Sequence, residues 1–298
     1  MATAMTKDTG ADRAFVISNY VVLFIFLLVV AYPLIYVVSA SFSSPSAVVS
    51  GQVWLWPVDF TMAGYEAVFR DDRIWIGFRN SLFYAVAGTT VNVIMTILAA
   101  YPLSRKDFGG RNVIMFLFVF TMLFSGGLIP TYLVVKQTGM LNTPWAMIIP
   151  GAILVYNMII TRTFFQQTIP DELLEAAQID GVSDFRFVRD VVLPLSGPII
   201  AVNALFYAVA HWNSFFNALI YLTNPDLFPL QIILRDILVQ DNIDPATMQN
   251  IQEALARQEL ARVLKYSLIV VATVPLLVVY PFVQKHFVRG VLIGSLKG

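Results

Sequence analysis

Six runs of mostly apolar residues alternate with more polar stretches along the chain. The runs cover residues 15–38, 81–103, 113–135, 145–165, 198–222 and 266–283. A helix needs about 20 predominantly apolar residues to cross the hydrocarbon core of a bilayer, and each run is close to that length. No internal repeat or low-complexity linker divides the chain. The pattern therefore predicts an all-α integral membrane protein with six transmembrane helices in a single domain, residues 1–298.

The first run could instead belong to a cleaved secretory signal. Lys7 and Arg13 precede it, and Val38, Ser39 and Ala40 resemble a small-residue cleavage site. Its apolar part is longer than the roughly 7 to 15 residues of a signal's hydrophobic region, which favours a retained membrane span.

Glycine and proline mark the expected irregularities of the spans. Most prolines lie near the ends of the runs, where they end or kink helices. The segment Gly126-Gly127-Leu128-Ile129-Pro130 is different because it lies inside the third run. It predicts a break within that span.

The composition agrees with residence in lipid. Of the 298 residues, 58% are hydrophobic and 13% are charged, whereas a soluble domain has about 25% charged residues. The mean hydropathy is +0.72. The formal net charge is zero, so the chain offers no basic field for nucleic acid. The absence of cysteine excludes disulfides, thiolate metal sites and cysteine catalysis.

The positions of Lys and Arg near the runs predict which side of the membrane each loop faces. One side holds Lys7, Arg13, Arg105, Lys106, Arg111, Arg162, Arg186, Arg189, Lys285, Arg289 and Lys297. If this side is cytoplasmic, both termini and the loop 168–195 lie in the cytoplasm, and the loops 39–80 and 223–265 lie outside. The bias is modest, because the opposite side carries Arg257, Arg262 and Lys265.

The runs contain few groups that could power transport or perform chemistry. An ion-coupled secondary transporter usually has ionisable residues inside its spans, and only His211 lies well inside one. No phosphate-binding Gly-rich motif, zinc-protease motif or nucleophile-elbow motif occurs. A secondary transporter, a channel and a membrane enzyme remain alternatives, but any energy from ATP must come from a partner.

The loop 168–195 is too polar to cross a bilayer, and its residues predict two short helices. Thr168-Ile169-Pro170-Asp171 has the form of a helix N-cap, followed by acidic residues that suit a helix N-terminus. Gly181 is a natural left-handed cap at the end of this first helix. Ser183 can cap a second helix, which we expect to stop at Leu193-Pro194.

The first of these helices has a surface suited to contact with another protein. Ala176 and Ala177 let a partner approach the backbone closely, and Glu175 and Asp180 bracket them with charge. Such a helix, anchored to the ends of two spans, can transmit a push from a soluble partner. An amphipathic helix lying on the lipid surface fits the same residues equally well.

The spacing of residues in this loop resembles a known motif. Glu175-Ala176-Ala177, then Gly181 after three residues, then Val191 and Leu193-Pro194, resembles the EAA loop of permease subunits of ABC importers. Four further segments resemble the shorter permeases of carbohydrate ABC importers, in the branch for oligosaccharides and polysaccharide fragments such as alginate. They are YPLSR, GGLIPTYLVVKQTGMLNTPWAMIIPG, HWNSFFNALIYL and YPFVQKHFVRGVLIGSLKG.

This resemblance implies a MetI-like fold of the type I importers and a role without catalysis in this chain. The first loop helix would be the coupling helix, docked on an ATPase subunit. Glu175 would pair with a basic residue there, Ala176 and Ala177 would pack closely, and Gly181 would make the turn. By the same resemblance Asp180, Leu193 and Pro194 complete the coupling site.

The resemblance also implies the partners. They are a second, different permease, two ATPase subunits that bind ATP and Mg, a periplasmic solute-binding protein, an oligosaccharide and the lipid of a bacterial inner membrane. No cofactor is expected in this chain. ATP binding and hydrolysis would switch the spans between outward-facing and inward-facing states. The tail 285–298 would either run along the ATPase or serve as a cytoplasmic anchor.

Polar side chains in the fourth and fifth runs are candidates for contact with a sugar. Asn203, Tyr207 and His211 recur at helical spacing on one face of the fifth run. The other candidates are Tyr156, Asn157, Asn213 and Asn217. Hydrogen bonding between helices of the bundle is the alternative role for each of them.

Overall fold

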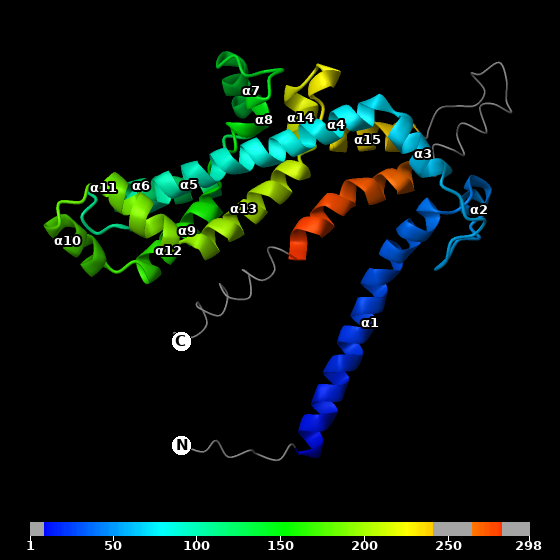
Figure 1. Ribbon diagram of the computed structural model, residues 1–298, viewed down its shortest axis with the longest axis horizontal. Coiled ribbons are helices and arrows are strands. Elements are labelled where there is room, and N and C mark those ends of the chain that lie inside the picture. Colours follow the sequence, from blue (N-terminus) through cyan, green and yellow to red (C-terminus); the bar gives the residue numbers. More distant parts are fainter. Residues whose placement is uncertain (1–8, 241–263, 282–298) are drawn as a thin grey trace. The chain divides into compact units, whose positions relative to one another are not determined.

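The computed structural model describes residues 9–240 and 264–281, and all regular secondary structure within these ranges is helical (Figure 1). The expected role of the tail 285–298, and the charges of Lys7, Arg257 and Arg262, concern residues outside the described ranges. The chain divides into two compact units. One comprises residues 1–71 and 237–272, and the other comprises residues 72–236 and 273–298.

The first unit is dominated by helix α1 (Gly10–Ser41), which is followed by α2 (Pro45–Val49) and α3 (Ala63–Arg70). Helix α1 begins with a capping box in which Thr9 and Asp12 satisfy each other's backbone N–H groups. With 32 residues, this helix is long and apolar enough to cross a membrane, and most of its large apolar side chains are exposed. At its C-terminal end the carbonyl of Ser41 accepts a hydrogen bond from Ser267, in the helix Leu264–Pro281.

The second unit is built around one long helix. It consists of α4 (Asp72–Phe83), a π-helical turn (Tyr84–Gly88) and α5 (Thr89–Ser104). Helix α5 packs against α9 (Val155–Thr168) and α13 (Gly197–Trp212). The remaining elements are α6 (Arg111–Leu123), α7 (Leu128–Gln137), α8 (Trp145–Ile148), α14 (Phe216–Tyr221), a 3₁₀ turn (Pro225–Leu227) and α15 (Leu230–Gln240).

The predicted break in the third run is confirmed. Helix α6 ends at Leu123, α7 begins at Leu128, and the two axes differ by 116°. Gly127 has φ 86°, a left-handed conformation that glycine adopts without the steric cost of a Cβ.

The fourth and fifth runs are not continuous helices, contrary to the simplest interpretation of their apolar length. Residues 149–154 separate α8 from α9, and residues 213–215 separate α13 from α14. Among the described residues, three helices are long and apolar enough to cross a membrane, and two bent helix pairs could each form one further span. Six crossings in a single domain therefore stays a prediction.

Side chains from neighbouring helices support the interruption at residues 149–154. The Asn92 amide on α5 donates to the carbonyl of Gly151 at 2.6 Å, and the N–H of Leu154 donates to the Tyr207 hydroxyl on α13 at 3.2 Å. Backbone groups freed inside a membrane need such partners, because hydrocarbon supplies none. Packing of α5 and α13 around α9 thus makes the interruption tolerable.

Candidate functional site

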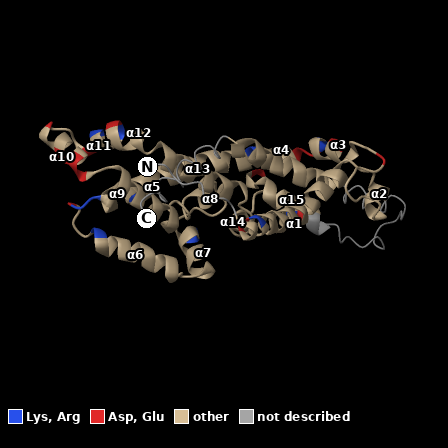
Figure 2. Ribbon diagram, turned by 90° about the horizontal axis from the view of Figure 1, so that it is seen from below, with Lys and Arg blue, Asp and Glu red and all other residues tan. Residues whose placement is uncertain are grey.

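The polar loop between α9 and α13 forms the predicted helix, glycine turn and second helix. The first helix is α10 (Asp171–Ile179). The second is a helical stretch made of α11 (Asp184–Phe187), a π-helical turn (Val188–Val192) and α12 (Leu193–Leu195). Figure 2 shows that charged residues of α10, α11 and the beginning of α6 lie at one end of this unit. The loop is a structured, polar element attached to an apolar bundle.

The start of α10 differs from the prediction. Thr168 does not cap α10, because it is the last residue of α9, and α10 begins at Asp171 after Pro170 without a side-chain cap. Proline disfavours a helical conformation in the preceding residue, and Ile169 accordingly has φ −117° and ψ 90°. The acidic Asp171 at the start of α10 is instead close to cations from another element.

The end of α10 is a Schellman motif centred on Gly181. The N–H of Gly181 donates to the carbonyl of Gln178, and the N–H of Val182 donates to the carbonyl of Ala177. Gly181 has φ 69°, and no atom within 4 Å would meet a Cβ placed on it. The turn that the sequence predicts is confirmed, and its demand for glycine comes from the backbone alone.

The second helix begins after Ser183 as expected but continues past the predicted stop. Ser183 occupies the N-cap position, although its side chain makes no capping bond. Pro194 lies inside the helical stretch, which bends by 81° only at Ser196, before α13. The π-helical turn just before Pro194 changes the hydrogen-bond pattern of the helix. The helical stretch can therefore contain a proline, which has no N–H to donate.

The residues predicted to form the coupling site divide between an exposed face and a packed face of this loop. Glu175, Ala176 and Asp180 are exposed, whereas Ala177 is half-buried against the hydrophobic core. Leu193 also packs against this core, and Pro194 is exposed. The structure therefore leaves the outer surface of α10 available to a partner. It does not gather the seven residues of the predicted coupling site, which also include Gly181, into one cluster.

Two large apolar side chains near the turn were not identified from the sequence. Ile179 is 88% exposed and Phe185 is 78% exposed. Phe185, Val188 and Val192 recur at helical spacing, but Val188 and Val192 pack on the core and Phe185 does not. Exposed apolar side chains beside a charged face are typical of protein interfaces.

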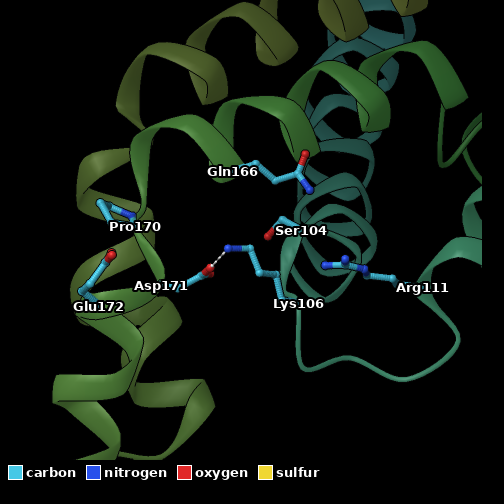
Figure 3. Close-up of a pocket in the computed structure, with 7 residues that line it drawn as sticks. All are labelled: Ser104, Lys106, Arg111, Gln166, Pro170, Asp171 and Glu172. Carbon is cyan, nitrogen blue, oxygen red and sulfur yellow. Dashed lines mark ion pairs between the residues drawn. The ribbon is translucent and has the colours of Figure 1, made fainter.

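The N-terminus of α10 is tied to the connection between α5 and α6. The Lys106 Nζ lies 2.8 Å from a carboxylate oxygen of Asp171, and a terminal nitrogen of Arg105 lies 3.7 Å from the other oxygen. Figure 3 shows Lys106 and Asp171 pointing towards each other across a pocket of about 300 Å³. The pocket is lined by Ser104, Lys106, Arg111, Gln166, Pro170, Asp171 and Glu172.

This ion pair shifts the pKa values of both partners. The hydrogen bond from Lys106 holds the pKa of Asp171 below its ordinary value, and the same bond raises the pKa of Lys106. Because the folded-state pKa of Asp171 is depressed, the pair stabilises the fold above the ordinary carboxyl pKa. That contribution is lost only as the pH falls through the lower folded-state pKa. The contact is therefore constant across neutral pH.

Three candidates of the fifth run form hydrogen bonds between helices, and they are Asn203, Tyr207 and His211. The Tyr207 hydroxyl lies 2.6 Å from the Thr96 hydroxyl, and His211 Nε2 lies 3.2 Å from the Asn92 side-chain oxygen. Asn203 donates to the Thr161 hydroxyl at 2.7 Å. All three candidates are buried inside the unit. Their contacts favour the packing role over contact with a sugar.

The other candidates do not share this arrangement. Asn157 is buried, and its carbonyl accepts a hydrogen bond from Thr161. Tyr156, Asn213 and Asn217 are exposed, and Asn213 donates to the carbonyl of Val209 at the end of α13. Among the described residues no group of three or more His, Cys, Asp or Glu could hold a metal ion.

The helical bundle with its polar loop agrees with the resemblance to a permease subunit of an ABC importer, and comparison with known proteins gives the family. Residues 74–293 match the family described as binding-protein-dependent transport system inner membrane component. The match covers more than half of the chain. The chain belongs to this family.

Individual relatives agree with this assignment. The chain is 44% identical over 287 residues to the polygalacturonan/rhamnogalacturonan transport system permease protein YtcP of Bacillus subtilis, covering 96% of this chain and 99% of that protein. It is 41% identical over 291 residues to Protein LplC of Bacillus subtilis, covering 98% and 97%. The first of these relatives confirms the resemblance to the carbohydrate branch of the family.

A solved structure gives the same result in three dimensions. It is the crystal structure of a bacterial ABC transporter involved in the import of the acidic polysaccharide alginate. A chain of it matches with a TM-score of 0.86 and 34% identity, over 95% of this chain and 100% of that chain. The protein is thus an all-helical, multi-pass permease of the inner membrane, which is not itself catalytic and which works with ATPase and binding-protein partners.

Proposed function

We propose that this chain carries acidic oligosaccharides across the membrane by alternating access and that α10 is its coupling helix. One observation carries the second part: α10 is a capped helix that exposes Glu175, Ala176 and Asp180 while Leu174 and Ala177 anchor it to the core. A helix fixed on one face and open on the other can receive a displacement and pass it to α9 and α13.

The anchoring also argues against the lipid-surface alternative. Phe187 and Val192 of the second loop helix are buried in the same core as Leu174, so these three apolar side chains are already covered by protein. A helix lying on lipid would keep such side chains for the membrane. The exposed Ile179 and Phe185 are then available to the ATPase, together with Glu175.

The proposed assembly contains a second, different permease and two ATPase subunits that bind ATP and Mg, with a binding protein on the outer face. In this arrangement α10 and both termini lie in the cytoplasm. Support comes from the cluster of Arg105, Lys106 and Arg111, which lies beside α10, since cations concentrate on cytoplasmic loops.

The proposed cargo follows from the named relatives. Polygalacturonan and alginate are both polymers of uronic acids, and the proteins named for them are 44% and 34% identical to this chain. We therefore infer an acidic oligosaccharide derived from such a polymer. The exposed Tyr156, Asn213 and Asn217 are the remaining candidates for contact with it, because hydroxyl and amide groups suit sugar hydroxyls.

The cargo can be tested with the purified complex of both permeases and both ATPases in liposomes. We expect the binding protein loaded with oligogalacturonate or alginate oligomers to stimulate ATP hydrolysis several-fold. The neutral malto-oligosaccharides of the same length are the control, and equal stimulation by them would contradict an acidic cargo. Uptake that follows an ion gradient and ignores ATP would favour the alternative, a secondary transporter or channel.

The packing role of the fifth-run residues gives a separate prediction. Tyr207→Phe removes the hydroxyl shared by Thr96 and the Leu154 N–H, so we expect it to lower the thermal stability of the detergent-solubilised complex. Interhelical hydrogen bonds in membranes contribute roughly 0.6 kcal/mol on average, which sets the scale. The order of preference among oligosaccharides should not change, whereas Asn213→Ala and Asn217→Ala should alter it. A changed preference in Tyr207→Phe with unchanged stability would return Tyr207 to the sugar pathway.

A further inference from the structure

Arg105 occupies an unusual position for an arginine at the end of a membrane helix. It directly follows α5 and is only 4% exposed, although cations at such ends normally extend into water or lipid headgroups. Burial of a guanidinium is costly unless its donors are paired. The partners of Arg105 therefore indicate what it is retained for.

Those partners belong to three different elements. One terminal nitrogen of Arg105 donates to the carbonyls of Phe165 and Ile169, each at 3.3 Å, at the end of α9. The other terminal nitrogen makes no hydrogen bond but lies within ion-pair range of the Asp171 carboxylate, at 3.7 Å, at the start of α10. The guanidinium also lies 5.7 Å from the ring centre of Tyr101 on α5. A single side chain thus joins α5, α9 and α10 at the point where the chain leaves the bundle for the coupling loop.

Two neighbouring cations strengthen the same junction. Lys106 Nζ lies 2.8 Å from the second oxygen of Asp171. A dashed line in Figure 3 marks this ion pair. Arg111, at the start of α6, donates to the carbonyl of Arg105 at 3.0 Å. Arg105 and Lys106 therefore share one acidic partner, Asp171. Asp171 is the first residue of α10 and does not belong to the exposed face of that helix.

Helix α5 extends the junction into the bundle. Thr96 on α5 contacts Tyr207 on α13, and Asn92 on α5 contacts both His211 on α13 and the interruption at Gly151. A displacement of α10 that reaches α5 through Arg105 would therefore reach α13 and the interrupted span without passing through the loop backbone. Along the backbone, the connection between α9 and α10 consists of Ile169 and Pro170 alone.

We propose that Arg105 is a positioning residue that makes α10, α5 and α9 move as one body during transport. This inference rests on the proposed coupling role of α10. Its consequence is that ATP hydrolysis becomes uncoupled from transport when Arg105 is replaced, even though the ATPase still binds the exposed face of α10.

The first test compares uptake and ATP hydrolysis in liposomes containing the complete complex, with oligogalacturonate as the probe. We expect Arg105→Gln to retain the ATPase during purification but to lower the uptake per ATP hydrolysed at least 10-fold. Arg105→Lys keeps the charge but loses the forked geometry, so its ratio should be intermediate. Arg189→Gln is the matched control, because Arg189 is exposed and pairs with its neighbour Asp190 on the same loop.

The outcomes separate coupling from mere stability. Wild-type uptake per ATP in Arg105→Gln would overturn the proposal. It would also be overturned if uptake and ATP hydrolysis fell together in proportion to lost ATPase subunits, because that pattern indicates a structural role. Failure of the proposed function is distinct, since the wild-type complex itself would then show no ATP-driven uptake.

A second test does not depend on how well Arg105 variants fold. The chain contains no cysteine, so Lys106→Cys combined with Asp171→Cys places two unique thiols on α10 and the α5–α6 connection. Joining them with a short bifunctional thiol reagent should raise the uptake per ATP relative to the unjoined double variant. Elements that move as one body tolerate such a link. Loss of uptake on linking would show that α10 moves relative to α5 and would overturn the proposal.

Discussion

Replacement of Gly181 by proline is expected to abolish ATP-driven uptake while the subunit still inserts in the membrane. Proline fixes φ near −65°, whereas Gly181 has φ 69°, and proline also lacks the N–H that Gly181 donates to Gln178. The turn between the two loop helices cannot form with this residue. Uptake by proteoliposomes and the amount of ATPase that copurifies with the permease measure the effect.

Graded substitutions at the same position test whether the backbone conformation is responsible. A left-handed conformation costs an ordinary residue roughly 1–2 kcal/mol, so Gly181→Val should lower the equilibrium constant for forming the native turn about 5- to 30-fold. Gly181→Asn should retain most of the uptake, because asparagine tolerates this conformation. A Cβ meets no atom within 4 Å there, so crowding cannot explain a difference. Equal activity of the asparagine, valine and proline variants would contradict the assigned role of the turn.

Glu175→Lys is expected to have the second large effect, through the ATPase rather than through the fold. Glu175 is exposed on α10, so its replacement leaves the packing of Leu174 unchanged. If it pairs with a basic residue of the ATPase, reversal of its charge leaves two cations facing each other. Loss of one partner of a buried interface pair costs about 2–5 kcal/mol, which weakens binding of the ATPase at least about 30-fold.

Glu172→Lys provides the matched control for this charge reversal. Glu172 is one turn earlier on α10, is also exposed, and lies beside the pocket near Lys106. Titration of the reconstituted permeases with purified ATPase should show weakened binding for Glu175→Lys and little change for Glu172→Lys. Wild-type affinity and uptake in Glu175→Lys would exclude its proposed role in coupling.

The loop 168–195 shows which features of the fold can be predicted from local sequence. Gly181 determines the turn through its left-handed conformation and backbone hydrogen bonds within a few residues, so a pattern of caps and glycine predicts it correctly. The same is true of the break at Gly127, which needs only a residue that tolerates positive φ. The N-cap predicted at Thr168 was wrong because α9 continues to Thr168 and Pro170 then separates the helices.

Features that depend on distant partners could not be predicted from one sequence. The interruption between α8 and α9 requires Asn92 and Tyr207, which are 59 and 53 residues away from the groups that they satisfy. Arg105 was counted only as a cation that indicates topology, because nothing nearby in the sequence marks it as buried. Asn203, Tyr207 and His211 were correctly placed on one face, but periodicity alone does not say whether that face meets a sugar or a helix.

The interruption at residues 149–154 has a consequence for how this part of the bundle bends. Its hydrogen bonds with Asn92 and Tyr207 come from side chains on α5 and α13, and these bonds are separate from the backbone ladders of α8 and α9. A change in the angle between α8 and α9 would therefore strain these two side-chain bonds rather than either backbone ladder, and both short helices can keep their own turns. The neighbouring helices α5 and α13 thus help to set the resting angle of the joint.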